Sequence, residues 1–390
     1  MSWDRMGDVA VLGRFVADAP GADEPRQGAS LDVSAPQAVR RLWVAKIEDE
    51  SETVRSFWLE PVDGRPLAAN LPGQFLPIAL DIPGRDVVRR TYTISSAFDG
   101  RTYRLSVKRE ALPGRPAGVA SNWMHDTLRV GSVIQANAPR GDFVIDDSAK
   151  RPIALISGGI GVTPMIAMLE HLVARDDPRE IVFLQAVRHS DDHAFRQHVR
   201  SVTAGRSHVR VHVRYSEPRA DDLESGKADS LGVIDEPLLR AVLPSPDIDV
   251  YLCGPPGFMQ AIYDALLRVG VPDRQIQFEA FGPASLQRQA APVALRRTEA
   301  TAAASERPTV RFAKSGIAAA WDPATENLLA FAEAQGLQPD FGCRSGTCGT
   351  CAVRATAGHH RYVDEPLADT LDGEVLICCA VPDGPIELDL

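Results

Sequence analysis

Features that define several other classes of protein are missing from this chain of 390 residues. It has no apolar run near the roughly 18 residues that a membrane-spanning helix needs. Its N-terminus lacks the basic stretch and long apolar segment of a secretory signal. Basic residues are outnumbered, 42 against 52, and the formal net charge of −10 disfavours nucleic acid and anionic membranes as partners. We therefore expect a cytoplasmic protein that binds neither membrane nor nucleic acid.

Cysteine is nearly absent from most of the chain and then gathers near its end. Cys253 stands alone, and the other five of the six cysteines lie between residues 343 and 379. Disulfide frameworks are rare in cytosolic proteins of this size, so such a cluster favours metal binding. A structural zinc site would normally show the spacing C-x2-C twice, which this sequence does not. The observed spacing is C-x4-C-x2-C followed by a later cysteine, which is typical of a plant-type [2Fe–2S] cluster.

The last part of the chain, residues 308–390, resembles plant-type ferredoxin domains through Gly342–Cys351 and Leu376–Pro382. Glycines in the first stretch allow backbone N–H groups to approach the cluster sulfurs. In that family a proline stands four residues after the fourth ligand, which implies Cys378 as the ligand and Cys379 as a packing residue. The resemblance implies an α+β domain of the β-grasp type. The implied metal ligands are Cys343, Cys348, Cys351 and Cys378.

The preceding residues divide into segments by composition and pattern. Residues 1–37 have few large apolar side chains and are expected to form a flexible tail. Residues 38–147 show short strand patterns between proline and glycine turns, which predicts an antiparallel β-barrel. Residues 148–284 alternate strand, turn and helix, which predicts a doubly wound parallel α/β sheet. Residues 285–307 have no aromatic side chain and are expected to be a linker, so the predicted fold class is multidomain.

An ordered series of motifs in residues 38–284 resembles the ferredoxin–NADP reductase superfamily and is most similar to the reductase half of flavohaemoglobins. Each motif is weak alone, since a strand with an arginine and a tyrosine is usually only a strand. The series is RTYT at 90–93, LSVKRE at 105–110, GVASNW at 118–123, PRGDF at 139–143, GGIGVTPM at 158–165, CGPPGFM at 253–259 and FEAFGP at 278–283. The resemblance implies that the barrel binds a flavin and that the α/β domain binds NAD(P)H.

The residue types in the first motifs suit a flavin, because its pyrophosphate is dianionic. Arg90 can pair with that group bidentately, and the amides from Gly118 to Ser121 can meet a phosphate where a helix begins. The resemblance implies that Tyr92 lies against the isoalloxazine and that Thr93 bonds its polar edge. The expected flavin-binding residues are Arg90, Thr91, Tyr92, Thr93, Val107, Lys108, Gly118, Val119 and Ser121. FMN serves the phthalate dioxygenase reductase type, which shares this domain order, but residues 118–125 are closer to the FAD-binding flavohaemoglobin pattern, so we expect FAD.

The nucleotide motifs place glycines and prolines where strands end and helices begin. Residues 158–163 are not a G-x-G-x-x-G fingerprint, so the dinucleotide assignment rests on the resemblance. The resemblance implies that Thr163 and Cys253 lie near the nicotinamide and that Phe281, close to Glu279, covers the flavin face. Cys253 has the alternative of an ordinary buried thiol. The expected catalytic residues are Thr163, Cys253, Glu279 and Phe281, and the expected nucleotide-binding residues are Gly159, Thr163, Arg188, Cys253, Gly254, Pro255, Met259 and Phe281.

The preference between NADH and NADPH depends on residues after the strand that ends near Leu184. Arg188 would favour the 2′-phosphate of NADPH, whereas Asp191 would hold the ribose 2′-hydroxyl of NADH. The likeness to flavohaemoglobins favours NADH.

Together these features predict an NAD(P)H-dependent oxidoreductase. A hydride carries two electrons and a [2Fe–2S] cluster accepts one, so a flavin must stand between them. The expected path is NADH to FAD to [2Fe–2S] to a partner protein. Residues 308–390 carry 12 acidic and 5 basic side chains, which favours a partner with a basic patch. The expected partner is the terminal component of a Rieske-type oxygenase, and the alternatives are a hybrid-cluster or di-iron acceptor, or a non-catalytic iron–sulfur relay or sensor.

Overall fold

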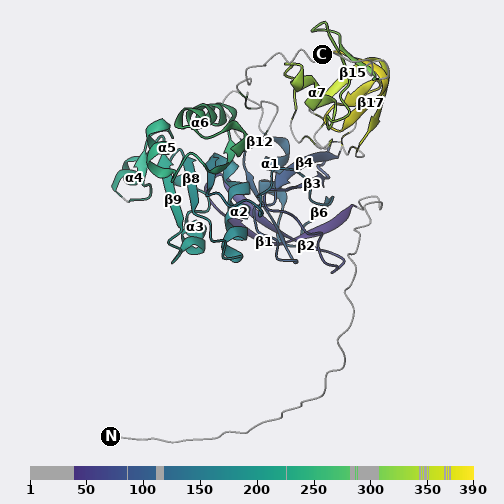
Figure 1. Ribbon diagram of the computed structural model, residues 1–390. Coiled ribbons are helices and arrows are strands. Elements are labelled where there is room, and N and C mark those ends of the chain that lie inside the picture. The colour runs from purple at the N-terminus through teal and green to yellow at the C-terminus, as the bar shows by residue number, and fades with distance from the viewer. Residues whose placement is uncertain are drawn as a thin grey trace, which may run out of the picture. The chain divides into compact units, whose positions relative to one another are not determined.

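The computed structural model contains three β-sheets. In Figure 1 the colour runs from purple in the first sheet to yellow in the third, following the chain. The structure describes residues 39–85, 87–110, 118–224, 226–281, 286, 288, 307–341, 344, 346, 349, 351–363, 366, 368 and 370–390. The predicted tail at 1–37 and most of the predicted linker at 285–307 lie outside the described residues. None of the helices described is long and apolar enough to cross a membrane.

The first sheet is antiparallel and has six strands in the order β4-β3-β6-β1-β2-β5. Its strands are β1 (Arg40–Asp49), β2 (Val54–Pro61), β3 (Phe75–Leu80), β4 (Val88–Thr93), β5 (Tyr103–Lys108) and β6 (Val133–Ala136). Strands β4 and β5, at the two ends of this order, meet through a bridge between Ile94 and Leu105, which closes the sheet into a barrel. Alternating apolar side chains such as Leu42 and Val44 fill its interior. The predicted antiparallel barrel is confirmed.

The second sheet is parallel, with the order β10-β9-β8-β7-β11-β12. Its strands are β7 (Ile153–Gly158), β8 (Ile181–Val187), β9 (Val209–Tyr215), β10 (Ser230–Leu231), β11 (Asp249–Gly254) and β12 (Ile276–Ala280). All residues of β7 and β11 are buried, as expected for strands covered on both faces. The strand order reverses between β7 and β11, and ligands of such sheets bind at this reversal, beyond the carboxyl ends of the strands.

Helices cover both faces of this sheet. They are α2 (Val162–Ala174), α3 (Arg196–Thr203), the short α4 (Ala220–Glu224), α5 (Glu236–Val242) and α6 (Pro256–Val269). Helices α2 and α3 share one core with Phe183, and α5 and α6 share the opposite core with Leu184. This arrangement confirms the predicted doubly wound α/β fold.

The barrel packs against the α2 face of the parallel sheet. Val54, Phe143 and Ile145 of the barrel belong to the same buried cluster as α2 and β7. The backbone N–H of Asp146 also donates to the Tyr251 hydroxyl at 2.9 Å. The flavin and nucleotide halves therefore share a hydrophobic core.

The third sheet has five strands in the order β14-β13-β17-β15-β16. Its elements are β13 (Thr309–Phe312), β14 (Ile317–Ala320), α7 (Leu328–Ala334), β15 (Ala352–Tyr362), β16 (Glu374–Leu376) and β17 (Ala380–Leu388). Strands β13 and β17 are parallel and the other pairs are antiparallel. Phe331 of α7 packs on Phe312 and Trp321 in the core of this domain. The mixed sheet with one packed helix is the fold expected for the ferredoxin part.

Candidate active site

The expected flavin strand, β4, borders a hollow lined by cations. The hollow has a volume of about 800 Å³ and is lined by Gly84, Arg85, Val87, Val88, Arg89 and Arg90. Three arginines around one hollow suit a dianionic pyrophosphate, so the site fits the predicted flavin. The sequence analysis proposed Arg90 alone, and the structure adds Arg85 and Arg89 beside it.

The other predicted residues of β4 are less exposed than Arg90. Thr91 pairs with Pro77 and Thr93 with Phe75 of β3, and Thr93 is buried. The Tyr92 ring packs half-buried against the barrel core. Burial raises the pKa of the Tyr92 hydroxyl to about 12, so it is a neutral hydrogen-bond donor at physiological pH.

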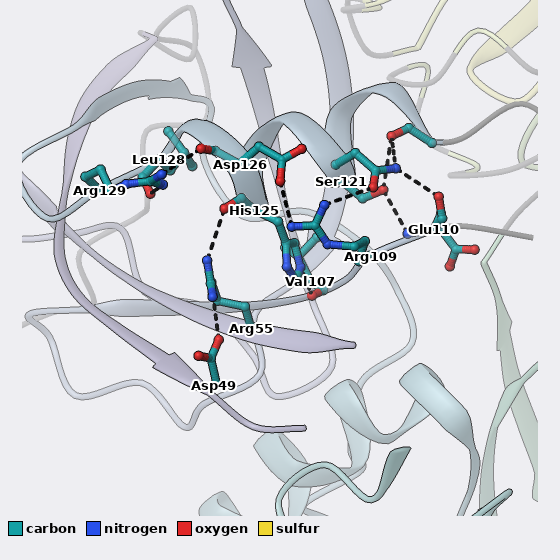
Figure 2. A network of polar contacts seen from close by, with 12 residues as sticks. Asp49, Arg55, Val107, Arg109, Glu110, Ser121, His125, Asp126, Leu128 and Arg129 are labelled. Atoms are coloured by element: carbon teal, nitrogen blue, oxygen red, sulfur yellow. Dashed lines mark hydrogen bonds and ion pairs between the residues drawn. The ribbon is translucent and has the colours of Figure 1, made fainter. Parts of the chain in front are cut away.

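Helix α1 (Val119–Thr127) begins beside the end of β5 and is fixed there by polar contacts, as Figure 2 shows. The ring Nε2 of His125 contacts the Val107 carbonyl at 2.8 Å, and Arg109 pairs with Asp126 at 2.7 Å. Gly118 is the N-cap of the helix and has no side chain to bond the first turn, so backbone N–H groups there can bind a phosphate.

The predicted residues around this helix start differ in how their side chains are used. The Ser121 hydroxyl accepts from the Glu110 N–H at 3.3 Å and donates to the Gly118 carbonyl at 3.4 Å. Its hydroxyl therefore helps to fix the loop, and a phosphate contact is expected from the helix amides. Val107 is buried in the barrel, while Lys108 and Val119 are half-buried beside it.

The nucleotide loop lies where β7 and β11 end side by side. Strand β7 passes through a short 3-10 turn at Gly159–Gly161 into α2, whose first turn has no side-chain cap. A Cβ on Gly161 would lie 2.3 Å from the Cys253 carbonyl oxygen, so the turn after β7 is in close backbone contact with the end of β11. Helices α2 and α6 both begin at this edge, where the positive end of each helix dipole favours an anionic phosphate.

Thr163 and Cys253, the two residues expected near the nicotinamide, come together at this edge. Both are buried, and the Thr163 hydroxyl donates to the Ile160 carbonyl at 3.0 Å. Burial, and then the nearby Glu279 carboxylate, raise the pKa of the Cys253 thiol well above its ordinary value. Cys253 is therefore a neutral thiol. A neutral, buried thiol contributes packing at this edge and is not a nucleophile.

Glu279 carries one of the buried polar atoms at this edge that have no hydrogen-bond partner among the described residues. It pairs with Cys253 across β11 and β12, and its Oε2 atom is buried without a hydrogen-bond partner among the residues described. Burial raises the pKa of Glu279 to about 8. A buried carboxyl oxygen that finds no partner among the described residues is costly, which fits a place completed by a bound polar ligand such as a nicotinamide.

The other predicted nucleotide residues lie around the same edge, with different exposure. Phe281 follows β12 and is 43% exposed, as expected of an aromatic that stacks on a ligand. Gly159 and Pro255 are exposed at the two loops, and Gly254 is buried. Met259 lies wholly in the core under α6, so its side chain packs the helix. The roles of these residues stay predictions.

The two residues expected to choose between NADH and NADPH are both in ion pairs. Arg188 pairs with Asp192, with Nε 2.7 Å from Oδ2. Asp191 pairs with Arg219, a partner that the sequence analysis did not consider. Neither charge is free to decide the preference alone, so the choice stays a prediction.

The described part of the cysteine loop brings sulfur atoms together. The Sγ atoms of Cys351 and Cys378 lie 3.0 Å apart, and both residues are buried. The Gly346 N–H donates to Cys378 Sγ at 3.2 Å, while Cys379 Sγ donates to the Leu376 carbonyl at 3.5 Å. Converging sulfurs with an N–H donor suit an iron–sulfur cluster and support Cys378 as a ligand. Cys343 and Cys348 lie outside the described residues.

Sequence patterns did not reveal one polar contact between the two halves of the reductase. Arg104 of β5 and Glu170 of α2 form a buried ion pair at 2.7 Å, although 66 positions separate them. No spacing rule links residues so far apart. Arg104 lies on the face of β5 opposite the core residues Tyr103, Leu105 and Val107, where a charged side chain gives no signal in the sequence.

Three family models match the chain in consecutive segments. The descriptions are "Oxidoreductase FAD-binding domain" for residues 42–145, "Oxidoreductase NAD-binding domain" for residues 155–264 and "2Fe-2S iron-sulfur cluster binding domain" for residues 313–383. They cover the barrel, the parallel α/β sheet and the C-terminal mixed sheet.

Curated relatives match about two thirds of the chain. A flavohemoprotein of Pseudomonas aeruginosa is 44% identical over 250 residues, which are 64% of this chain and 60% of the relative. A flavohemoprotein of Bacillus cereus is 36% identical over 247 residues, 63% of this chain and 61% of the relative. The chain thus spans about 60% of the length of these relatives.

Two solved structures match different shares of the chain. The flavohem-like FAD/NAD binding domain of nitric oxide dioxygenase from Vibrio cholerae is 36% identical, with a TM-score of 0.58, and covers 63% of this chain and 99% of its own. Phthalate dioxygenase reductase is 27% identical, with a TM-score of 0.51, and covers 90% of this chain and 98% of its own. The chain therefore belongs to the ferredoxin reductase-like NAD(P)H-dependent oxidoreductases, with flavohaemoprotein-like FAD- and NAD-binding domains followed by a C-terminal 2Fe-2S domain.

Proposed function

We propose that this chain is the NADH-dependent reductase component of a multicomponent oxygenase, most simply one of the Rieske type. One observation carries the proposal: a single chain holds FAD-, NAD- and 2Fe-2S-binding domains, and 90% of it matches phthalate dioxygenase reductase over nearly its whole length. The solved structure of that reductase is described as modular, for electron transfer from pyridine nucleotides to [2Fe–2S]. The same direction of transfer is proposed here.

Each of the three domains matches a model for binding one of the three groups in the proposed path, namely FAD, NAD and the 2Fe-2S cluster. When bound, a flavin accepts an electron pair from a nicotinamide and delivers electrons singly to an iron–sulfur cluster. The chain's own residues hold and shield these groups. Arg85, Arg89 and Arg90 supply cations for the flavin pyrophosphate, and the first turn of α1 supplies N–H donors for a phosphate.

The nicotinamide edge is proposed to be dry and neutral before the nucleotide arrives. Cys253 is a buried thiol, and Glu279, with its pKa of about 8, is mostly protonated at pH 7. A protonated Glu279 can donate a hydrogen bond to a polar group of the nicotinamide without placing a negative charge beside it. We therefore propose Glu279 as the residue that holds a proton at this edge.

The partner is proposed to present a basic surface to the ferredoxin domain. Acidic side chains at Asp322, Glu326, Asp340, Asp372 and Asp383 are exposed there. Opposite charges speed the encounter of redox partners, which is typically small and weak.

The partner is tested by comparing acceptors under identical conditions. Purified holoprotein and NADH are mixed with a Rieske-type oxygenase, a di-iron hydroxylase component and a hybrid-cluster protein from the same source, and reduction of each acceptor is followed by absorbance. The proposal predicts that the Rieske centre is reduced fastest. Preferential reduction of either other acceptor would replace the Rieske assignment, and absence of NADH oxidation with all three, and with cytochrome c, would point to a relay or sensor.

A further inference from the structure

Glu170 joins the nucleotide half of the reductase to the flavin barrel with both of its carboxylate oxygens. Its Oε1 atom accepts from Arg104 Nη2 at 2.7 Å, and its Oε2 atom accepts from the Ala97 N–H at 2.8 Å. Arg104 and Ala97 both belong to the segment that leaves β4 and returns as β5. The side chains of Arg104 and Glu170 are only 6% and 16% exposed. One carboxylate thus clamps α2 to a hairpin of the barrel.

Arg104 extends this clamp to the end of the flavin strand. Its Nε donates to the Ser95 carbonyl at 3.1 Å and contacts the Ser95 hydroxyl at 3.2 Å. Its guanidinium also lies 5.0 Å from the ring centre of Phe195, which precedes α3 in the nucleotide half. Ser95 stands two residues after Thr93. The guanidinium therefore fixes the backbone beside the expected flavin contact and touches the nucleotide half at two points.

His198 of α3 completes the carboxylate's surroundings. Its Nε2 atom lies 2.6 Å from Glu170 Oε1. Burial alone would raise the pKa of Glu170, but the hydrogen bond from His198, the charge of Arg104 and the Ala97 N–H outweigh it and hold that pKa below its ordinary value. Glu170 is therefore ionised at physiological pH, with its charge compensated by donors from both halves.

The clamp lies on the same helix that carries the nicotinamide edge. Thr163 and Glu170 are seven residues apart on α2, which is close to two turns, so they share one face of the helix. At the barrel end, Ser95 follows the strand that carries Tyr92 and Thr93. A shift at the clamp would therefore displace both α2 and the end of β4, which border the proposed hydride-transfer site.

We propose that Glu170 is a positioning residue for hydride transfer, which holds α2 and the end of β4 at the spacing that brings nicotinamide and flavin to reacting distance. The ion pair between Arg104 and Glu170 suits this task better than apolar packing, because a buried ion pair tolerates few alternative geometries. The inference rests on the proposed placement of nicotinamide beside Thr163 and of flavin beside Thr93. It assigns no contact between Glu170 and either cofactor.

The test compares Glu170→Gln with Glu180→Gln in the flavin-loaded protein. Glu180 forms an exposed ion pair with Arg210 at 2.6 Å, so the control removes the same kind of charge away from the clamp. Stopped-flow reduction by NADH gives the limiting rate of flavin reduction and the Kd for NADH, and 4-deuterated NADH gives the isotope effect. Hydrogen exchange of residues 93–99 and thermal melting provide readouts that do not depend on activity.

A loss of positioning predicts a limiting rate that is about 10- to 100-fold lower in Glu170→Gln, since displacements near 1 Å have effects of this size. We expect Kd to change less than about threefold, the isotope effect to rise or stay full, and exchange at 93–99 to increase. Glu170→Asp is a second variant, which keeps the charge but shortens the side chain. Its limiting rate of flavin reduction should lie between those of the wild type and Glu170→Gln.

Two outcomes would overturn the inference, and they can be told apart from failure of the proposed function. A folded Glu170→Gln protein with a limiting rate within twofold of the wild type would remove the positioning role. A rate loss explained wholly by a higher Kd would make Glu170 a binding determinant instead. If NADH failed to reduce the flavin of the wild type, the proposed function itself would be wrong, and the inference would fall with it.

Discussion

The substitution Gly161→Ala tests how closely the turn that follows β7 must approach the end of β11 at the nucleotide edge. A Cβ at Gly161 would lie 2.3 Å from the carbonyl oxygen of Cys253, 2.5 Å from its carbonyl carbon and 2.7 Å from the N atom of Gly254. All three are backbone atoms, which have no rotamer to move out of the way. Contacts below 3.0 Å are essentially never seen for a Cβ, so the turn at Gly159–Gly161 and the end of β11 must separate by about 0.7 Å or more.

This displacement sets the expected size of the effect. Thr163 follows Gly161 by two residues and Cys253 is itself the residue pushed, so both expected nicotinamide neighbours move. Shifts approaching 1 Å in a reacting geometry cost up to about 100-fold in rate. We predict that Gly161→Ala lowers kcat/KM for NADH by about 10- to 100-fold while FAD and the cluster stay bound.

Gly257→Ala is the matched control for this prediction. Gly257 lies in the first turn of α6 at the same edge, and a Cβ there would meet nothing within 4 Å. The kcat/KM of Gly257→Ala should stay within about twofold of the wild-type value. Its stability should equal or slightly exceed that of the wild type, because alanine favours a helix over glycine by roughly 1 kcal/mol. Steady-state kinetics with NADH and ferricyanide measure both variants. Equal activity of Gly161→Ala and Gly257→Ala would refute the close-approach argument.

Four further predictions concern the cluster, the buried carboxyl group and the partner. Cys378→Ser should abolish the 2Fe-2S absorbance and Cys379→Ser should largely keep it, and the reverse result would exchange their roles. Gly346→Ala should weaken cluster retention, because its Cβ would lie 2.6 Å from Cys379 Sγ, whereas Gly373→Ala, also at positive φ but in open space, should retain the cluster. Because burial raises the pKa of Glu279 from 4.5 to about 8, ionising it costs the folded state up to about 5 kcal/mol, which corresponds to the pKa difference. The Tm advantage of Glu279→Gln over the wild type should therefore grow as pH rises from about 4.5 to about 8, and a pH-independent difference would contradict this. Raising salt should slow electron transfer to the partner while leaving flavin reduction by NADH nearly unchanged, and salt-independent transfer would argue against charge steering.

The fold classes were predictable because their signals are local in the sequence. Buried runs such as Ile153–Ile156, followed by glycine and a helical stretch, identified the parallel sheet one unit at a time. The cysteine spacing likewise fixed the cluster type within a short segment. Such signals need no knowledge of distant parts of the chain.

Features that depend on distant residues could not be predicted in this way. The ion pairs of Arg188 with Asp192 and of Asp191 with Arg219 neutralise charges that the sequence left free to choose a nucleotide. The clamp of Glu170 on Arg104 and Ala97 requires the barrel and the α/β sheet to be already packed together. The burial that raises the pKa of Glu279 also comes from the assembled sheet.

Anaerobic titration of the purified holoprotein with NADH tests whether electrons pass from the nicotinamide through the flavin to the cluster. Flavin absorbance and the EPR signal of the reduced 2Fe-2S centre are followed together, in the native protein and after removal of the flavin. The account predicts that about 1.5 equivalents of NADH reduce both centres of the native protein, since a flavin and a cluster take three electrons together. It also predicts that the flavin-free protein is reduced by dithionite and not by NADH. Cluster reduction by NADH without flavin, or none with flavin present, would contradict the account.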